Sequence, residues 1–259
     1  MFFMPLSFLI GALILLSVEF SSARAANPNP EGDYVVLLHG LGRTALSMKR
    51  LEHFFNARGY RVVNLSYPST CFSVEELANV HLDRQLRQAI SDPTARIHFV
   101  THSLGGIILR QYLSNHTIQN LGRVVMIAPP NHGSDLIDHL KTCALARRVL
   151  GPGALELGTD PHAILNRLGP LDFQCGVIAG DRSFNPFFSR LLKGPNDGKV
   201  TVESAQADGM RDFLVLHSSH TWLIWRKQTL DQALCFLKSG HFSRNNKPAK
   251  HSACSCIGI

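Results

Sequence analysis

Short runs of apolar, often β-branched residues alternate along the chain with longer stretches in which apolar residues recur at helical spacing. Continuous apolar runs are typical of strands covered on both faces of a sheet. They predict six strands, at residues 34–39, 61–67, 96–101, 123–128, 173–179 and 213–217. The stretches between them predict helices at residues 46–58, 74–90, 105–115 and 221–238. Ser73 and Glu76 have the spacing of a capping box at the start of the second helix.

This alternation of strands and helices predicts an α/β fold, with a mostly parallel sheet flanked by helices on both sides. In such folds ligands bind beyond the carboxyl ends of the strands. The residues that directly follow each apolar run are therefore the first place to look for chemistry.

The stretch 135–171 interrupts the alternation, because it has helical pieces and a Gly151-Pro152-Gly153 centre but no strand pattern. It is either a lid inserted over the site or a plain two-helix crossover, and the pattern leaves both open. The catalytic domain is expected to span residues 34–240. The polar tail at residues 241–259 is predicted to be disordered.

The first 18 residues carry no charge, and residues 6–16 form an apolar run that precedes the small-x-small sequence Ala23-Arg24-Ala25. This pattern predicts a signal peptide at residues 1–25, export to the periplasm or the medium, and a Pro-rich linker at residues 26–33. No Lys or Arg precedes the apolar run, which leaves an uncleaved membrane anchor or a misassigned start as alternatives. The run is shorter than the roughly 20 residues that span a bilayer.

The composition is that of a globular protein with one core: 45% of the 259 residues are hydrophobic and 17% are charged. The formal net charge is +7, but the cations are scattered and no nucleic-acid-binding motif appears. We therefore expect no nucleic-acid partner, and expect a mild attraction to anionic lipid or cell-envelope surfaces.

The six cysteines are too few for a disulfide scaffold, although Cys71, Cys143, Cys175 and Cys235 could include one pair. Cys254-Ser255-Cys256 lacks a second pair of ligands at suitable spacing, so no metal site is predicted there.

The strongest chemical signal is His102-Ser103-Leu104-Gly105-Gly106, where an apolar strand leads into a serine and two glycines that open a helix. A sharp strand-to-helix turn lifts the serine above the sheet, and small neighbours allow the close approach of the backbone. Ser103 therefore fits the G-x-S-x-G nucleophile elbow, except that Thr101 occupies the first position. A Ser-Gly helix N-cap is the structural alternative.

A second motif, His39-Gly40-Leu41-Gly42, follows the first predicted strand. Acyl transfer needs preorganised N–H donors for the oxyanion of its tetrahedral intermediate. The backbone amides of Leu41 and of Leu104 are predicted to be these donors. His39 is interpreted as a residue that fixes the loop, and not as the catalytic base.

A serine nucleophile needs a base that a carboxylate orients, and in this fold the chain order is Ser, then Asp or Glu, then His. His217 and His220 both follow the last predicted strand; His220 lies in the loop before the final helix and is the preferred base. Asp181 follows a strand directly, whereas Asp197 lies in a polar turn. The residues themselves leave the choice of acid open.

Together these motifs resemble the lipase/esterase branch of the α/β-hydrolase superfamily, including bacterial triacylglycerol-lipase-like proteins. The similarity extends over residues 34–237 and includes Asn196-Asp197-Gly198, Ala128-Pro129-Pro130-Asn131-His132-Gly133-Ser134 and His220-Thr221-Trp222-Leu223. In that family the Asn-Asp-Gly aspartate is the triad acid, so the resemblance favours Asp197. It implies an ester or lipid substrate and no cofactor, and no acidic cluster suited to calcium stands out.

The same triad would also serve an acyltransferase, a thioesterase or an amidase, and a non-catalytic binding protein with a hydrolase fold is a further alternative. The presence of every triad residue type in the expected order argues against the non-catalytic reading. The sequence indicates neither the acyl chain length nor an oligomeric state.

Overall fold

The computed structural model describes residues 32–92, 94–160 and 163–244. The predicted signal peptide, most of the linker and residues 245–259 lie outside the described residues. Six parallel strands form one sheet in the order β2-β1-β3-β4-β5-β6. They are β1 (Tyr34–Leu38), β2 (Arg61–Leu65), β3 (Ile97–His102), β4 (Leu121–Ile127), β5 (Cys175–Gly180) and β6 (Asp212–Leu216). The predicted α/β fold is confirmed, and each predicted strand overlaps an observed one.

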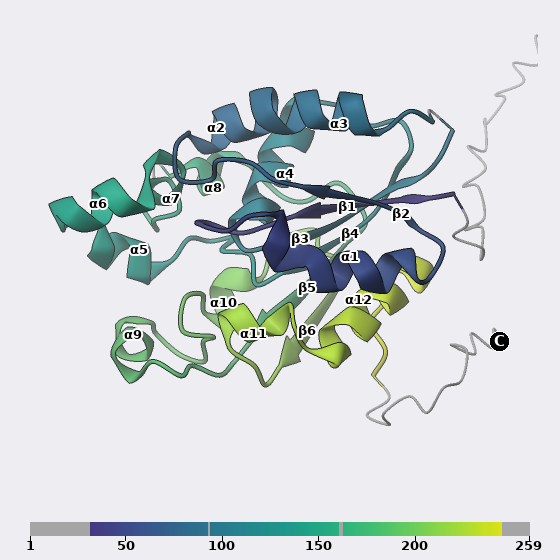
Figure 1. Ribbon diagram of the computed structural model, residues 1–259. Coiled ribbons are helices and arrows are strands. Elements are labelled where there is room, and N and C mark those ends of the chain that lie inside the picture. The colour runs from purple at the N-terminus through teal and green to yellow at the C-terminus, as the bar shows by residue number, and fades with distance from the viewer. Residues whose placement is uncertain (1–31, 93, 161–162, 245–259) are drawn as a thin grey trace, which may run out of the picture.

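Helices cover both faces of this sheet (Figure 1). In chain order they begin with η1 (Ala45–Met48), α1 (Lys49–Asn56), α2 (Val74–Glu76), the π-helical stretch η2 (Leu77–Leu82), α3 (Asp83–Ala89) and α4 (Leu104–Asn115). The later ones are α5 (Asp135–Leu140), α6 (Ala144–Leu150), α7 (Pro152–Leu155), α8 (Ile164–Arg167), α9 (Pro186–Leu191), α10 (Val202–Ala205), α11 (His220–Leu223) and α12 (Lys227–Ser239). The capping box is present, since the side chains of Ser73 and Glu76 each accept a backbone N–H of the other residue.

The alternation of side chains along each strand divides the core into two layers. In β1, Val36 and Leu38 pack with α4 and η2 on one face, whereas Val35 and Leu37 pack with α1 and α12 on the other. All five residues of β1 are buried. A strand covered on both faces must be apolar at every position, which is why its sequence forms a continuous run.

Residues 135–171 are here called the cap segment. Its described residues, 135–160 and 163–171, form the four short helices α5 to α8 at the carboxyl edge of the sheet (Figure 1). The segment is therefore not a plain two-helix crossover, and whether it moves as a lid stays a prediction. It is attached to the start of α2 and to the loop before it: Phe72 O accepts a hydrogen bond from Gly153 N (3.0 Å), and Glu156 accepts one from Val74 N (2.9 Å). Burial raises the pKa of the Glu156 carboxyl.

A buried arginine joins the end of the cap segment to the central helix α4. Arg110 donates hydrogen bonds to Asn131 Oδ1 (3.0 Å) and to Gly169 O (2.7 Å), and Asn131 in turn donates to Ala205 O (2.9 Å). These bonds satisfy polar groups that would be costly to bury without partners. The loop after β4, the cap segment and α10 are thereby held in fixed positions.

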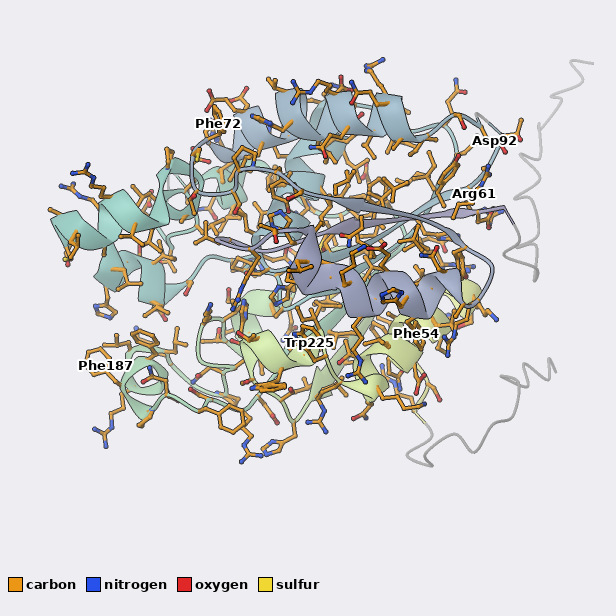
Figure 2. All side chains as sticks on the ribbon, in the orientation of Figure 1. Phe54, Arg61, Phe72, Asp92, Phe187 and Trp225 are labelled. Atoms are coloured by element: carbon orange, nitrogen blue, oxygen red, sulfur yellow. The ribbon has the colours of Figure 1, made fainter. Side chains whose placement is uncertain are left out.

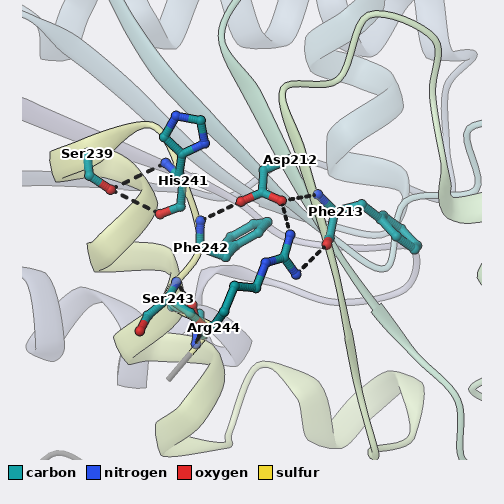
Figure 3. A network of polar contacts seen from close by, with 8 residues as sticks. Asp212, Phe213, Ser239, His241, Phe242, Ser243 and Arg244 are labelled. Carbon is teal, nitrogen blue, oxygen red and sulfur yellow. Dashed lines mark hydrogen bonds and ion pairs between the residues drawn. The ribbon is translucent and has the colours of Figure 1, made fainter. Parts of the chain in front are cut away.

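The structure differs from the sequence-based expectation at two places near the C-terminus. The predicted helix 221–238 is two helices, because α11 ends at Leu223 and α12 begins at Lys227. Residues 241–244 are packed against the domain, so the prediction of disorder is wrong for them: Phe242 is buried in the core, and Asp212 accepts hydrogen bonds from Phe242 N (2.7 Å) and from the Arg244 guanidinium (Figure 3). Burial of the Phe242 ring thus extends the folded domain to residue 244, although the segment around it is polar.

Two further observations concern the described residues alone. Cys71, Cys143, Cys175 and Cys235 all have free thiols, so no disulfide pairs any two of them. No helix in residues 32–92, 94–160 or 163–244 has the length and apolar character needed to cross a membrane.

Candidate active site

Ser103 occupies a strained turn between the end of β3 and the start of α4. Its backbone has φ 54° and ψ −124°, in the region that L-residues rarely adopt. The turn is held by a hydrogen bond from Ser103 N to Ile127 O (2.9 Å). Because α4 starts against β1, residue 105 has no room for a side chain: a Cβ there would lie 2.6 Å from Leu38 O. The elbow expected from the sequence is therefore formed, with Thr101 fully buried at the position where the motif commonly has glycine.

The two backbone amides predicted to bind an oxyanion flank this turn. Leu104 is the first residue of α4, so its N–H has no intrahelical acceptor. The Leu41 amide donates no hydrogen bond within the described residues. The loop that carries Leu41 lies beside the serine, since a Cβ on Gly40 would be 3.1 Å from Ser103 Cβ. The loop follows β1 and Ser103 follows β3, so the site lies where the strand order reverses, the usual ligand crevice of an open α/β sheet.

A buried aspartate–histidine pair completes the site. His220 Nδ1 and Asp197 Oδ2 are 2.7 Å apart, and the two side chains are 5% and 1% exposed. The other oxygen of the carboxylate accepts hydrogen bonds from the amides of Lys199 (2.9 Å) and Val200 (2.8 Å). The backbones are also joined, because His220 N donates to Asp197 O (3.0 Å). A carboxylate at Nδ1 keeps the proton on that nitrogen and leaves Nε2 free to act as a base.

His217 and Asp181, the alternatives for the base and the acid, form a separate pair at the surface. His217 Nδ1 and Asp181 Oδ1 are 2.9 Å apart, but the His217 side chain is 71% exposed and Asp181 34%. Thus the structure pairs His220 with Asp197 and pairs His217 with Asp181. Only the first pair is shielded from water.

His102 is a neighbour of His220 to which the sequence analysis assigned no role. Its Nε2 bonds to His220 O (3.1 Å), and the two rings lie 4.8 Å apart between centroids. Burial, and next the charge that His220 would carry, hold the pKa of His102 well below its ordinary value. His102 is therefore a neutral positioning residue that connects the end of β3 to the start of α11. The only signal for it in the sequence is its place directly before Ser103.

The link between Ser103 and the base is not closed in this structure. Within the described part of the chain, the Ser103 hydroxyl makes no hydrogen bond to the His220 ring. Such bonds commonly tighten only when substrate is bound. The contact between His102 and His220 nevertheless places the imidazole beside the residue that precedes the serine.

His39 has the loop-fixing geometry expected from the sequence. Its Nδ1 bonds to Gly40 O (2.9 Å), its Nε2 accepts from Tyr67 N (3.3 Å), and its ring stacks on that of Tyr67 at 4.0 Å. Since Nε2 must accept a hydrogen bond, the ring is held neutral. Burial lowers the pKa of His39 below its ordinary value of 6.5.

This neutral histidine predicts a loss of stability in acid. The unfolded chain gains a proton at residue 39 as the pH falls through about 6.5, whereas the folded chain does not until a lower pH. The contribution of the His39 side chain to the free energy of unfolding is therefore complete above pH 6.5. It declines below that pH, with a limiting slope of about 1.4 kcal/mol per pH unit. Urea unfolding of His39→Gln between pH 7.5 and 5.5 should show a shallower slope than the wild-type protein. The exposed His139, changed to Gln, is the control; equal slopes for the wild-type protein and His39→Gln would contradict the interpretation.

A cavity of about 470 Å³ lies on the loop after β4 and against α10, lined by residues that include His132, Ser134, Thr201, Glu203 and Met210. Neither Ser103 nor the Asp197–His220 pair lines it. In the described residues, no group of three or more His, Cys, Asp or Glu side chains is arranged to hold a metal ion.

The chain belongs to the α/β hydrolase family, whose model matches residues 35–245. Solved structures similar to it include lipases and esterases. The mature form of the Bacillus licheniformis lipase BlEst2 superposes with a TM-score of 0.68 at 19% identity, over 81% of this chain and 94% of that one. The metagenomic carboxyl esterase MGS0156 gives a TM-score of 0.60 at 20% identity, over 74% and 65%.

The phospholipase PlaB from Legionella pneumophila, solved with thio-NAD, gives a TM-score of 0.62 at 20% identity over 79% of this chain. The match covers just over half of PlaB, 56% of its length. No curated protein matches the chain significantly. This chain shares the α/β-hydrolase fold with these structures, which are a lipase, a carboxyl esterase and a phospholipase, and that fold agrees with the resemblance carried by the motifs.

Proposed function

We propose that the protein is a serine hydrolase that cleaves carboxylic esters, including lipid esters, through an acyl-enzyme. The observation that carries the proposal is the buried Asp197–His220 pair, joined through His102 to the strained turn of Ser103. A structural N-cap serine would need neither the strain nor a shielded histidine beside it. Both features serve a nucleophile that must face substrate and lose a proton.

In the proposed mechanism Ser103 Oγ attacks the ester carbonyl while His220 Nε2 takes its proton. The carbonyl oxygen becomes an oxyanion that the amides of Leu41 and Leu104 hold by hydrogen bonds. The C–O bond to the alcohol then breaks, and His220 returns the proton to the departing alcohol. Water attacks the acyl-enzyme in the same way, which frees the acid and restores the Ser103 hydroxyl.

Asp197 orients the imidazole throughout and stabilises the positive charge that His220 carries between the two proton transfers. Three N–H groups, the amides of Lys199 and Val200 and the His220 ring Nδ1–H, donate hydrogen bonds to the carboxylate and fix its position.

The proposal is tested by a fluorophosphonate probe together with p-nitrophenyl esters from acetate to palmitate. We expect the probe to label the protein at Ser103, as read by peptide mass spectrometry, and we expect ester turnover. A matched thioester and anilide with the same acyl group separate an esterase from a thioesterase or amidase, and added alcohol reveals acyl transfer. A folded protein that neither reacts with the probe nor turns over any ester would contradict the proposal.

A further inference from the structure

Four large apolar side chains project into solvent at the carboxyl edge of the sheet, from α6 and from α9 with the loop before it. Leu145 and Val149 on α6 are 72% and 67% exposed, and Phe184 and Phe187 at α9 are 62% and 67% exposed. Both helices lie at the end of the molecule toward which the strands run (Figure 1). In Figure 2, Phe187 lies at the outer end of the molecule.

Helical backbone, with N-cap hydrogen bonds in α9, fixes the positions of Leu145, Val149 and Phe187. Leu145 and Val149 are four residues apart, so they lie on one face of α6. In α9, Asn185 Oδ1 accepts hydrogen bonds from the amides of Phe187 (3.0 Å) and Phe188 (3.2 Å), which fixes the first turn. The helices are connected through α5, which contacts α9 and precedes α6 in the chain. Exposed apolar side chains on two elements at the same end of the molecule are what a surface that meets an apolar phase requires.

The charged residues next to these side chains in the sequence are cations. Residues 139–155 and 182–196 contain no Asp or Glu, and together they contain Lys141, Arg147, Arg148, Arg182, Arg190 and Lys193. Lys141 pairs with Asp138 and Asp160, whereas the other five cations form no ion pair within the described residues. Arg182 instead lies over the ring of Phe184, 4.8 Å from its centroid. Unpaired cations beside exposed apolar groups match a surface that offers anionic headgroups above acyl chains.

We propose that α6 and α9, with the residues around them, form a docking surface for an anionic lipid bilayer. The apolar side chains enter the boundary between headgroups and acyl chains, and the arginines and lysine contact lipid phosphates. The surface lies at the same edge of the sheet as Ser103 and His220, so docking presents the site to the bilayer. The inference deepens the proposed function by naming bilayer lipid as the source of the ester, but the binding step itself does not require catalysis.

The test is cosedimentation of the full-length Ser103→Ala protein with vesicles of phosphatidylcholine alone or with phosphatidylglycerol added. We expect stronger partition onto the anionic vesicles, decreasing as salt is raised. Arg147→Gln with Arg190→Gln should weaken partition about 30-fold, since each cation near such a surface contributes about fivefold. Phe184→Ser with Phe187→Ser should weaken it about tenfold or more.

Matched controls remove the same chemistry from other faces. Val80, 55% exposed on η2, is changed to Ser, and the exposed Arg50 and Arg84 are changed to Gln. These variants should partition like the parent. All the proteins share one N-terminal segment, so differences between them cannot come from residues 1–31.

Equal partition of parent and surface variants, or equal binding to neutral and anionic vesicles, would overturn the docking surface. A second result would also overturn it: the protein self-associates in light scattering, the Phe184 and Phe187 substitutions abolish this self-association, and the protein does not bind vesicles. Turnover of a short, soluble ester by surface variants that retain Ser103 should match wild type. If that turnover is absent from the wild-type protein as well, the proposed function fails while the binding result still stands.

Discussion

Ser103→Ala is expected to lower kcat/KM for a p-nitrophenyl ester by about 10⁴-fold or more and to abolish labelling by a fluorophosphonate. The substitution removes the only atom that forms the covalent bond to the acyl group, and the oxyanion amides and the binding of substrate supply what activity remains. Initial rates at several ester concentrations measure the effect. Ser114→Ala, on the exposed side of the same helix α4, is the matched control and should act like wild type.

A stability measurement separates loss of chemistry from loss of fold. Ser103 donates no side-chain hydrogen bond within the described residues, so its removal should leave the urea midpoint almost unchanged. Retention of more than about a tenth of the wild-type kcat/KM by a folded Ser103→Ala protein would exclude Ser103 as the nucleophile.

Asp197→Asn is expected to lower kcat by about 10⁴-fold with only a small change in KM. The amide is isosteric with the carboxylate, but its NH₂ group would donate toward His220 Nδ1. The imidazole would then carry its proton on Nε2, the nitrogen that must accept the proton of Ser103. Rates at saturating ester, compared with the rate for wild type, measure this loss.

Asp181→Asn is the matched control, because it makes the same chemical change in the other aspartate–histidine pair. Its effect on kcat should be less than about twofold, since exposed ion pairs contribute little and His217 is open to water. If Asp181→Asn lost activity and Asp197→Asn kept it, Asp197 would not be the acid of the triad. That result would not affect the assignment of Ser103 as the nucleophile.

Local sequence was sufficient to predict the strands and the elbow. A strand buried on both faces, such as β1, must be apolar at every residue, and that requirement is visible in the sequence without any knowledge of its neighbours. The turn at Ser103 is similar, because the close approach of α4 to β1 allows no side chain at residue 105. Both constraints fix residue types that can be seen locally: a continuous apolar run along the strand, and glycine directly after the turn at Ser103.

The break between α11 and α12 and the packing of Phe242 could not be predicted in this way. No glycine or proline marks the break, and the segment that contains Phe242 is polar in composition. Both features depend on contacts with the sheet: α12 packs against the same layer as β1 and β4, and Phe242 enters that layer beside Phe236. Contacts between residues that are far apart in the chain produce no periodic pattern of apolar residues in the sequence.

By itself, the sequence determined the α/β architecture, the elbow at Ser103 and the order of serine, acid and histidine along the chain. Only the tertiary structure decided which aspartate meets which histidine. Asp181 and Asp197 both follow β5, and His217 and His220 both follow β6, so either pairing agrees with the chain order. The physical reason is that a hydrogen bond across 23 residues, buried between two loops, depends on where the strands place those loops, and not on the residues beside it.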